Sequence, residues 1–196
     1  MPAAAPSRAS AAPPAQQRGR QQGFGLVSLL ITIAVLGVLG QIAWPAWHGA
    51  VLKRRLETLA VEFAHDLQLA RSLALSGERA LRLSVIHASG GSCYVLHLAP
   101  HDRCHCTPTE AGCESDSAPI RYRWIASSSG TRLMANVPGV TLHPGEGFVT
   151  SAGTFRIEQS ATGRGIWYLL SPAGRVRSCA RDWAPSALPP CTRPLA

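Results

Sequence analysis

The sequence predicts an α+β protein in which one long N-terminal helix precedes an antiparallel β-sheet or sandwich. Three observations predict this fold. No Asp, Glu, Lys or Arg occurs between Arg20 and Lys53, so a long apolar stretch follows a polar N-terminal segment. Apolar residues then recur at helical spacing as far as Ala74, and from Leu81 onward they alternate with polar residues as in strands. A chain of 196 residues has room for one globular core.

Residues 1–23 are rich in Ala, Pro and Gln and contain three Arg and no acidic residue. This composition predicts no ordered structure. Residues 24–47 form an apolar segment long enough to span a bilayer as a helix. Positive charge ahead of such a segment predicts a cytoplasmic N-terminus and export of the chain beyond Lys53. An ordinary secretory signal or a plain single-span anchor are the alternatives, although a secretory signal has a shorter apolar run and a small-x-small cleavage site.

Residues 48–77 are predicted to extend the helix as an amphipathic segment. Steps of three or four place seven apolar residues on one face: Leu52, Leu56, Leu59, Phe63, Leu67, Ala70 and Ala74. The charged residues lie mostly off that face, including Glu62 and Asp66. Gly77 is suited to end the helix. Pro45 is predicted to kink it without ending the pattern.

Residues 78–182 are predicted to form the antiparallel β domain. Leu81, Leu83 and Val85 alternate with polar residues, and further strands are predicted near residues 93–98, 120–125, 154–159, 165–170 and 174–179. Residues 101–117 are predicted to be a loop. The Pro-rich tail, residues 183–196, is predicted to lack regular structure.

The segment that begins at Gly23 and Phe24 and continues through Pro45 resembles the processing site of type IV pilins and type II secretion pseudopilins. The usual form of that site is Gly followed by Phe-Thr-Leu-Ile-Glu and an apolar helix. The resemblance implies the type IV pilin fold, cleavage by a prepilin peptidase between Gly23 and Phe24, and methylation of Phe24. It also implies a single-pass protein of the inner membrane, with its globular domain in the periplasm. Other major or minor pilins or pseudopilins would be its partners in a pilus or pseudopilus.

Ser28 departs from the pattern of this family, which normally has Glu five residues into the mature chain. In the family, a buried carboxylate at this position is thought to pair with the N-terminus of the neighbouring subunit and to offset a costly buried charge. Serine cannot form that pair. We therefore expect a filament tip or another position that needs no such pairing, or else weak incorporation into filaments.

Residues 70–85 and 171–179 resemble the globular domain shared by H-type pseudopilins and the minor pilins FimT and FimU. Within it, the sequence Gly-Arg-Val-Arg from Gly174 to Arg177 resembles the Gly-Arg-x-Arg motif of FimT-type minor pilins. In those proteins the motif is associated with DNA binding during natural transformation. In a strand, Arg175 and Arg177 would point to the same face and could contact successive phosphates.

Other basic residues near the C-terminus would widen such a DNA-binding patch. The chain carries a net charge of +8, and six arginines against two acidic residues follow Thr150. Those that would extend the patch are Arg164, Arg181 and Arg193, and Trp183 could stack on a base of single-stranded DNA. The alternative is structural, because two arginines on an edge strand also discourage pairing with another sheet.

Six cysteines follow the apolar segment: Cys93, Cys104, Cys106, Cys113, Cys179 and Cys191. An even number in an oxidising compartment indicates disulfides, and six cysteines allow 15 complete pairings. We favour Cys179 with Cys191, which would tie the tail to the last strand. Cys104 and Cys106 are too close for easy mutual bonding. The alternative is a metal site from His101, Cys104, His105, Cys106 and Cys113, but their spacing does not fit the usual pair of Cys-x-x-Cys units.

No residue pattern predicts catalysis. The chain lacks a Gly-x-Ser-x-Gly elbow and a Gly-rich phosphate loop, so we expect neither enzyme activity nor a cofactor. Two functions remain. One is a FimT-like minor pilin that binds extracellular DNA for uptake. The other is a structural or priming minor pilin, or an H-type pseudopilin of type II secretion, without a DNA role.

Overall fold

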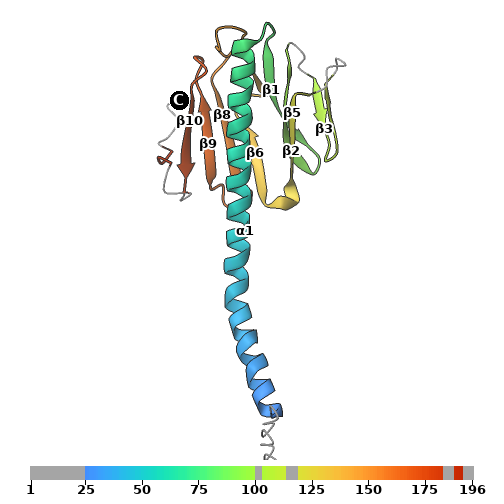
Figure 1. The fold of residues 1–196 in the computed structure, drawn as a ribbon, viewed down its shortest axis with the longest axis vertical. Coiled ribbons are helices and arrows are strands. Elements are labelled where there is room, and N and C mark those ends of the chain that lie inside the picture. The colour runs from blue at the N-terminus through green and yellow to red at the C-terminus, as the bar shows by residue number, and fades with distance from the viewer. Residues whose placement is uncertain (1–24, 100–102, 114–118, 183–187, 192–196) are drawn as a thin grey trace, which may run out of the picture. The chain divides into compact units, whose positions relative to one another are not determined.

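The computed structural model describes residues 25–99, 103–113, 119–182 and 188–191. The chain divides between Trp44 and Pro45 into two units, which are taken in turn. Helix α1 (Leu26–Ser76) contributes its N-terminal part to the first unit. The second unit contains the rest of α1 and the strands (Figure 1).

The described part of the first unit is the apolar beginning of α1. By length and composition, α1 can cross a membrane, with a mean hydropathy of 2.4 over its most apolar window. Its apolar side chains are exposed from Leu26 to Trp44, so no protein core covers them within this unit. Ser28 lies in the first turn, where its N–H donates to the carbonyl of Gly25 at 2.8 Å. The predicted cleavage site, Gly23 and Phe24, lies outside the described residues.

The second part of α1 packs on the sheets through the predicted apolar face. Leu56, Phe63, Ala70 and Ala74 are fully buried, and Leu59 and Leu67 nearly so. The ring of Phe63 meets that of Tyr94 edge to face, with centroids 5.1 Å apart, and also contacts two aromatic rings of the opposite sheet. The predicted amphipathic face is therefore confirmed. The helix ends at Ser76, one residue before the predicted Gly77.

Two four-stranded antiparallel sheets cover this face of α1 (Figure 1). The N-terminal sheet has the order β5-β2-β1-β7 and consists of β5 (Arg121–Ala126), β2 (Gly91–Leu98), β1 (Leu81–Ala88) and β7 (Gly139–Leu142). The C-terminal sheet has the order β10-β9-β8-β6 and consists of β10 (Val176–Arg181), β9 (Gly165–Leu170), β8 (Gly153–Gln159) and β6 (Thr131–Ala135). A short 3-10 helix, η1 (Ser127–Ser129), lies between β5 and β6.

The core lies between α1 and the inner faces of both sheets. It includes Leu83 and Leu96 from the N-terminal sheet and Phe155 and Ile157 from the C-terminal sheet, all at most 1% exposed. The sheets are also joined directly, because the Oγ of Ser92 in β2 accepts the N–H of Leu133 in β6 at 3.2 Å. The α+β class predicted from the sequence is confirmed.

A small third sheet, the cysteine hairpin, pairs β3 (Cys104–Cys106) with β4 (Ala111–Cys113). The prediction of a loop over residues 101–117 is therefore wrong for these residues. Strands of three residues are too short to show an alternating apolar pattern. Strands β6 and β7 were also not predicted, since they are only five and four residues long, Pro138 lies between them and β7 begins with Gly139.

Candidate functional site

The Gly-Arg-Val-Arg sequence lies where the β9–β10 hairpin turns. The N–H of Ser171 donates to the carbonyl of Arg175 at 3.0 Å, and the N–H of Arg175 donates to the Oγ of Ser171 at 3.2 Å. Arg175 therefore closes the loop, and β10 begins one residue later at Val176. The prediction that both arginines lie in the strand is correct for Arg177 and wrong for Arg175. Both side chains are exposed.

Gly174 has a structural role in this turn. It is buried and has a φ of 69°, a left-handed conformation that glycine adopts without strain. A Cβ at this position would overlap the carbonyl oxygen of Gly147 and would lie 3.7 Å from the Cζ of Arg71. The glycine of the motif is therefore required by the packing of the chain. Arg71, which sequence reasoning did not place here, brings a further guanidinium from α1 to this end of the hairpin.

The register of the C-terminal sheet gathers further arginines on its outer face, away from α1. Cys179 pairs with Trp167, Trp167 with Arg156, and Arg156 with Met134. Two residues further along the strands, a second row crosses the sheet in the same way. It contains Arg181 of β10, Gly165 of β9, Glu158 of β8 and Arg132 of β6, each paired with the next. The residues that alternate with them on β8 and β9 belong to the core, namely Phe155, Ile157, Ile166 and Tyr168, so these rows face outward. This outer face thus carries Arg132, Arg156, Arg177 and Arg181.

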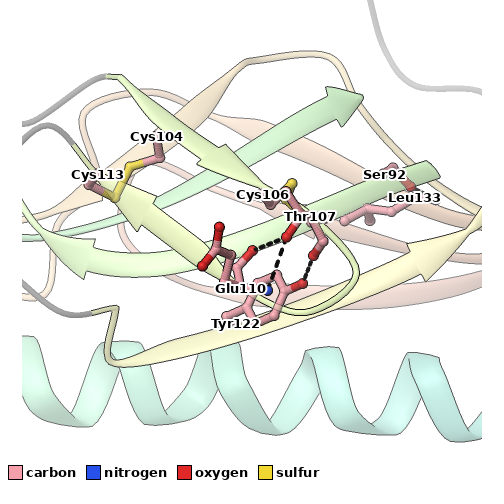
Figure 2. Close-up of a disulfide and its surroundings, with 9 residues drawn as sticks. Ser92, Cys104, Cys106, Thr107, Glu110, Cys113, Tyr122 and Leu133 are labelled. Carbon is pink, nitrogen blue, oxygen red and sulfur yellow. Dashed lines mark hydrogen bonds between the residues drawn. A yellow bond between two sulfur atoms is a disulfide. The ribbon is translucent and has the colours of Figure 1, made fainter. Parts of the chain in front are cut away.

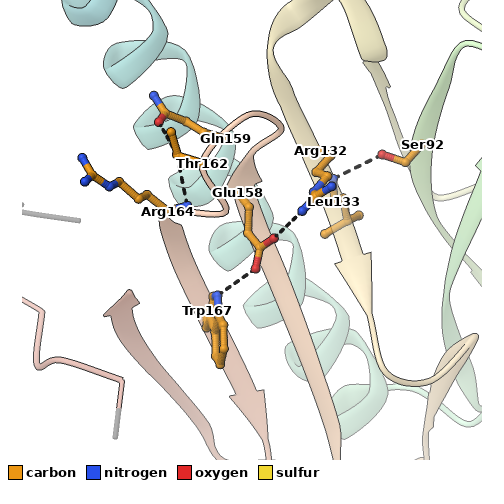
Figure 3. A network of polar contacts seen from close by, with 8 residues as sticks. All are labelled: Ser92, Arg132, Leu133, Glu158, Gln159, Thr162, Arg164 and Trp167. Carbon is orange, nitrogen blue, oxygen red and sulfur yellow. Dashed lines mark hydrogen bonds and ion pairs between the residues drawn. The ribbon is translucent and has the colours of Figure 1, made fainter. Parts of the chain in front are cut away.

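Trp167 organises the centre of this outer face. The guanidinium carbons of Arg156 and Arg181 lie 4.8 and 5.1 Å from its ring centroid, distances suited to cation–π contact. Its Nε1–H donates to Glu158 Oε1 at 3.1 Å, and Glu158 Oε2 accepts from Arg132 Nη2 at 3.3 Å (Figure 3). Trp167 and Glu158 are buried, whereas Arg132 is exposed. Two buried side chains therefore hold the guanidinium groups of exposed Arg132 and Arg181 and of partly buried Arg156 on this outer face.

Not all of the predicted DNA-binding residues lie together. Arg164 is exposed, but it occupies the turn between β8 and β9, where its N–H donates to Thr162 Oγ1 (Figure 3). Arg181 pairs with Gly165, so Arg164 and Arg181 share the end of the hairpin opposite Gly174. The predicted set is therefore spread along the whole hairpin. Trp183 and Arg193 lie outside the described residues.

Sequence reasoning missed Arg132 and Arg156 as members of this face. Arg156 stands between Phe155 and Ile157, both of which are buried, so its alternation with apolar residues was a usable signal. Arg132 stands between Thr131 and Leu133 in the same way. What could not be read from either segment is that both strands belong to the same sheet as β10.

The pair Cys179–Cys191 favoured from the sequence forms a disulfide, with Cα atoms 4.9 Å apart. Backbone hydrogen bonds support it, because the N–H of Ala180 donates to the carbonyl of Pro189 and the N–H of Cys191 donates to that of Ala180, both at 2.9 Å. Residues 188–191 are thereby held against the outer edge of β10.

The cysteine hairpin is closed by the disulfide Cys104–Cys113 (Figure 2). A second disulfide, Cys93–Cys106, joins it to β2. Cys93, Val95 and Cys106 form a second small core. The hydroxyl of Tyr122 in β5 donates to the carbonyl of Thr107 (Figure 2). The hairpin is therefore a fixed cover on the N-terminal sheet.

The residues of the metal alternative are arranged differently from a thiolate site. Cys104, Cys106 and Cys113 are all in disulfides, and His105 is exposed. His101 lies outside the described residues. His97 lies near Cys104 and Cys113, but it is buried and its Nε2 lies 2.9 Å from the Oγ of Ser84. Its ring therefore links β2 to β1 within the N-terminal sheet.

Asp66 differs from its predicted place off the apolar face. It is only 7% exposed, and its Oδ2 accepts the hydroxyl of Tyr94 at 2.8 Å. Arg121 Nε lies 3.7 Å from its other carboxylate oxygen. Burial, followed by the hydrogen bond to Asp66, raises the pKa of Tyr94 above its ordinary value. Asp66 is therefore a buried polar contact between α1 and β2.

One continuous helix with an exposed apolar beginning, followed by two antiparallel sheets packed on its second part, defines the class of pilin-like subunits. A family model described as the type II transport protein GspH matches residues 59–174, and the chain belongs to this family. Membership confirms the predicted group of H-type pseudopilins and minor pilins, without distinguishing its FimT-type members.

Two crystal structures of the type IV minor pilin FimU of Pseudomonas aeruginosa resemble this chain. Both are 23% identical to it. The P21 form has a TM-score of 0.49 and covers 68% of this chain and 94% of that one. The P65 form has a TM-score of 0.46 and covers 67% and 98%. No curated protein matches the chain.

Proposed function

We propose that this chain is a non-catalytic minor pilin that binds extracellular DNA for uptake in natural transformation. The binding surface is the outer face of the C-terminal sheet together with the Gly174 turn. The observation that carries this proposal is the gathering of Arg132, Arg156, Arg177 and Arg181 on one face, where the register places Glu158 as the acidic partner. Arg175 lies in the turn that precedes β10, two residues before Arg177.

The chemistry of this face suits the phosphate backbone of DNA. Guanidinium groups donate two parallel hydrogen bonds to phosphate oxygens, and alternate residues of a strand lie about 6.5 Å apart. Arg177 and Arg181 of β10 present such donors along the strand, and exposed Arg175 adds another from the turn. Trp167 is buried under two arginines and offers no free ring for base stacking. We infer backbone binding with little sequence preference.

Cleavage of the N-terminal segment and anchoring by α1 would bring the chain to the outside of the cell. A prepilin peptidase cuts between Gly23 and Phe24, and Phe24 becomes the methylated N-terminus. The apolar part of α1 anchors the subunit in the inner membrane, with the globular domain in the periplasm. Other pilins or pseudopilins then take the subunit into a filament. The exposed apolar side chains from Leu26 to Trp44 support this proposal, because they need a lipid or protein environment.

A second candidate function is a structural one, in which the chain primes a pilus or serves as an H-type pseudopilin without binding DNA. Membership of the GspH family favours it. So does the position of β10 at the edge of its sheet, because exposed Arg177 would discourage another strand from pairing where residues 188–191 do not cover that edge.

The test of DNA binding compares two double variants of the full chain in detergent. R175A/R177A removes the predicted phosphate contacts, and R54A/R55A removes two exposed arginines of α1 as a matched control. Fluorescence anisotropy with a labelled random duplex is expected to show roughly tenfold weaker binding for the first variant. The slope of its log affinity against log salt concentration should correspond to about two fewer phosphate contacts.

Equal affinity of R175A/R177A and the unmodified chain would refute this surface as the DNA site. A deletion strain scored separately for transformation, twitching and protein secretion decides between the two functions. Loss of transformation supports DNA uptake, and loss of secretion with normal transformation supports the pseudopilin.

A further inference from the structure

A groove separate from the arginine face lies between the second part of α1 and strand β5. Its volume is about 770 Å³, within the range of small-molecule sites. Trp47, Val51 and Leu59 of α1 line it together with Ile125 of β5. Leu59 and Ile125 are each 5% exposed and form its base, whereas Trp47 is 69% exposed and forms its open end. The groove therefore has an apolar base that is open to the surroundings.

The polar rim of the groove is basic. Among the residues that the structure describes, Arg54, Arg55 and Arg123 line it, and no Asp or Glu does. Arg123 is paired with Glu62 at 3.2 Å. Arg54 and Arg55 are exposed and form no hydrogen bond or ion pair with the described part of the chain. Two guanidinium groups thus stand available beside an apolar surface.

The place of the groove along α1 indicates what would occupy it. Trp47 is the last residue of the apolar segment, and Trp44 and Trp47 are both 69% exposed. Exposed tryptophans at the end of an apolar helix are typical of the membrane–water interface. Arg54 and Arg55 follow Trp47 by seven and eight residues, or about 10–12 Å along a helix, and their long side chains can reach back toward the headgroup layer.

We propose that this groove binds an anionic phospholipid, with the phosphate at Arg54 and Arg55 and the adjoining acyl carbons against Trp47, Val51 and the apolar base of the groove. The ligand class follows from the pairing of an apolar base with a basic rim, since a lipid supplies both an apolar chain and an anion. Inorganic phosphate would leave the apolar base uncovered. The inference rests on the proposed membrane anchor. It implies that the subunit binds an anionic lipid at the membrane surface before it enters a filament.

The test uses the full chain purified in a neutral detergent with equal amounts of phosphatidylglycerol and phosphatidylcholine of identical acyl chains. Native mass spectrometry counts the lipids that remain bound. We expect phosphatidylglycerol to be retained in an excess of roughly fivefold or more. R54Q/R55Q should retain both lipids equally, and W47A should lose both. R175Q/R177Q should still retain phosphatidylglycerol in excess over phosphatidylcholine. R54Q/R55Q should bind DNA as tightly as the unmodified chain.

Equal retention of the two lipids by the unmodified chain would overturn the proposal, as would an unchanged excess in R54Q/R55Q. Displacement of the lipid by soluble glycerol phosphate at equal concentration would also overturn it, by showing that the apolar base contributes nothing. A lipid-free dimer at this groove would assign it to a second copy instead. Flotation of the chain with pure phosphatidylcholine vesicles tests the membrane anchor separately, because it needs no anionic headgroup.

Discussion

The indole Nε1–H of Trp167 donates a hydrogen bond to the buried carboxylate of Glu158 at 3.1 Å. This contact lies on the outer face of the C-terminal sheet, between β8 and β9. The same carboxylate accepts from Arg132, and the same ring lies under Arg156 and Arg181. Glu158 therefore has two opposing effects on the proposed function, since it orders the arginines and also cancels part of their charge.

Two substitutions of Glu158 separate these effects. E158Q keeps an oxygen that accepts from Trp167 but removes the negative charge, so DNA affinity should rise and its salt dependence should steepen. Its loss of stability should stay within about 1 kcal/mol, because Arg132 is exposed. E158A leaves the buried indole N–H without an acceptor and should cost about 1–3 kcal/mol more.

Urea unfolding and anisotropy with labelled duplex measure these two quantities on the same samples. Lower DNA affinity in a fully folded E158Q would contradict the prediction. It would show that the carboxylate acts mainly by ordering Arg132.

Gly174 offers a test of how the turn is built. G174A places a Cβ on the carbonyl oxygen of Gly147 in addition to the strain of a φ of 69°, so we expect a loss of at least about 2 kcal/mol. Gly163 is the matched control, because its φ is 67° and no atom lies within 4 Å of its Cβ position. G163A should lose only about 1 kcal/mol, the cost of the left-handed conformation alone. Equal losses in thermal or urea unfolding would show that Gly147 moves aside readily.

The helix was predictable from the sequence because its pattern is local. In the stripe from Leu52 to Ala74, each apolar residue lies three or four positions from the next, so the helical face can be recognised from the local sequence. Six of the seven residues are buried. Asp66 was misplaced because its burial depends on Tyr94, which lies 28 residues later. A polar residue that a distant partner satisfies leaves no sign in local periodicity.

The candidate site was only partly predictable for the same reason. Arg175 and Arg177 were found through a sequence motif, whereas Arg132 and Arg156 join them through strand pairing. Which strands share a sheet, and in which register, depends on contacts far apart in the chain. The cysteine hairpin is a further case, since disulfides and the cover of β2 hold strands that are too short to show a pattern.

The disulfide Cys179–Cys191 should contribute more to stability than to DNA binding. It closes a loop of 12 residues, so C179S/C191S is expected to lose about 3 kcal/mol. The β9–β10 ladder, which runs from Val176 to Arg181, is independent of the disulfide and should keep the arginines in place. DNA affinity should therefore fall less than in R175A/R177A. An equal or larger fall would mean that residues 188–191 hold part of the binding surface.

Tyr168 makes the stability of the protein sensitive to high pH. Its hydroxyl donates to the carbonyl of Ala60 in α1 at 2.7 Å, and burial raises its pKa from 10.0 to about 12. Below pH 10 the phenol is protonated in both folded and unfolded chains, so its full contribution is present. Above pH 10 the unfolded chain ionises first, and the free energy of unfolding should decrease up to about pH 12.

Y168F should be less stable than the unmodified chain at neutral pH, because it leaves the carbonyl of Ala60 without this donor. Its free energy of unfolding should decrease less between pH 10 and 12, so the two curves should approach each other. Some decrease should remain, because burial also raises the pKa values of Tyr94 and Tyr122. Urea unfolding at several pH values measures the difference between the variants. Parallel curves would show that the phenol of Tyr168 ionises equally readily in the folded chain, and that its contact with α1 opens at high pH.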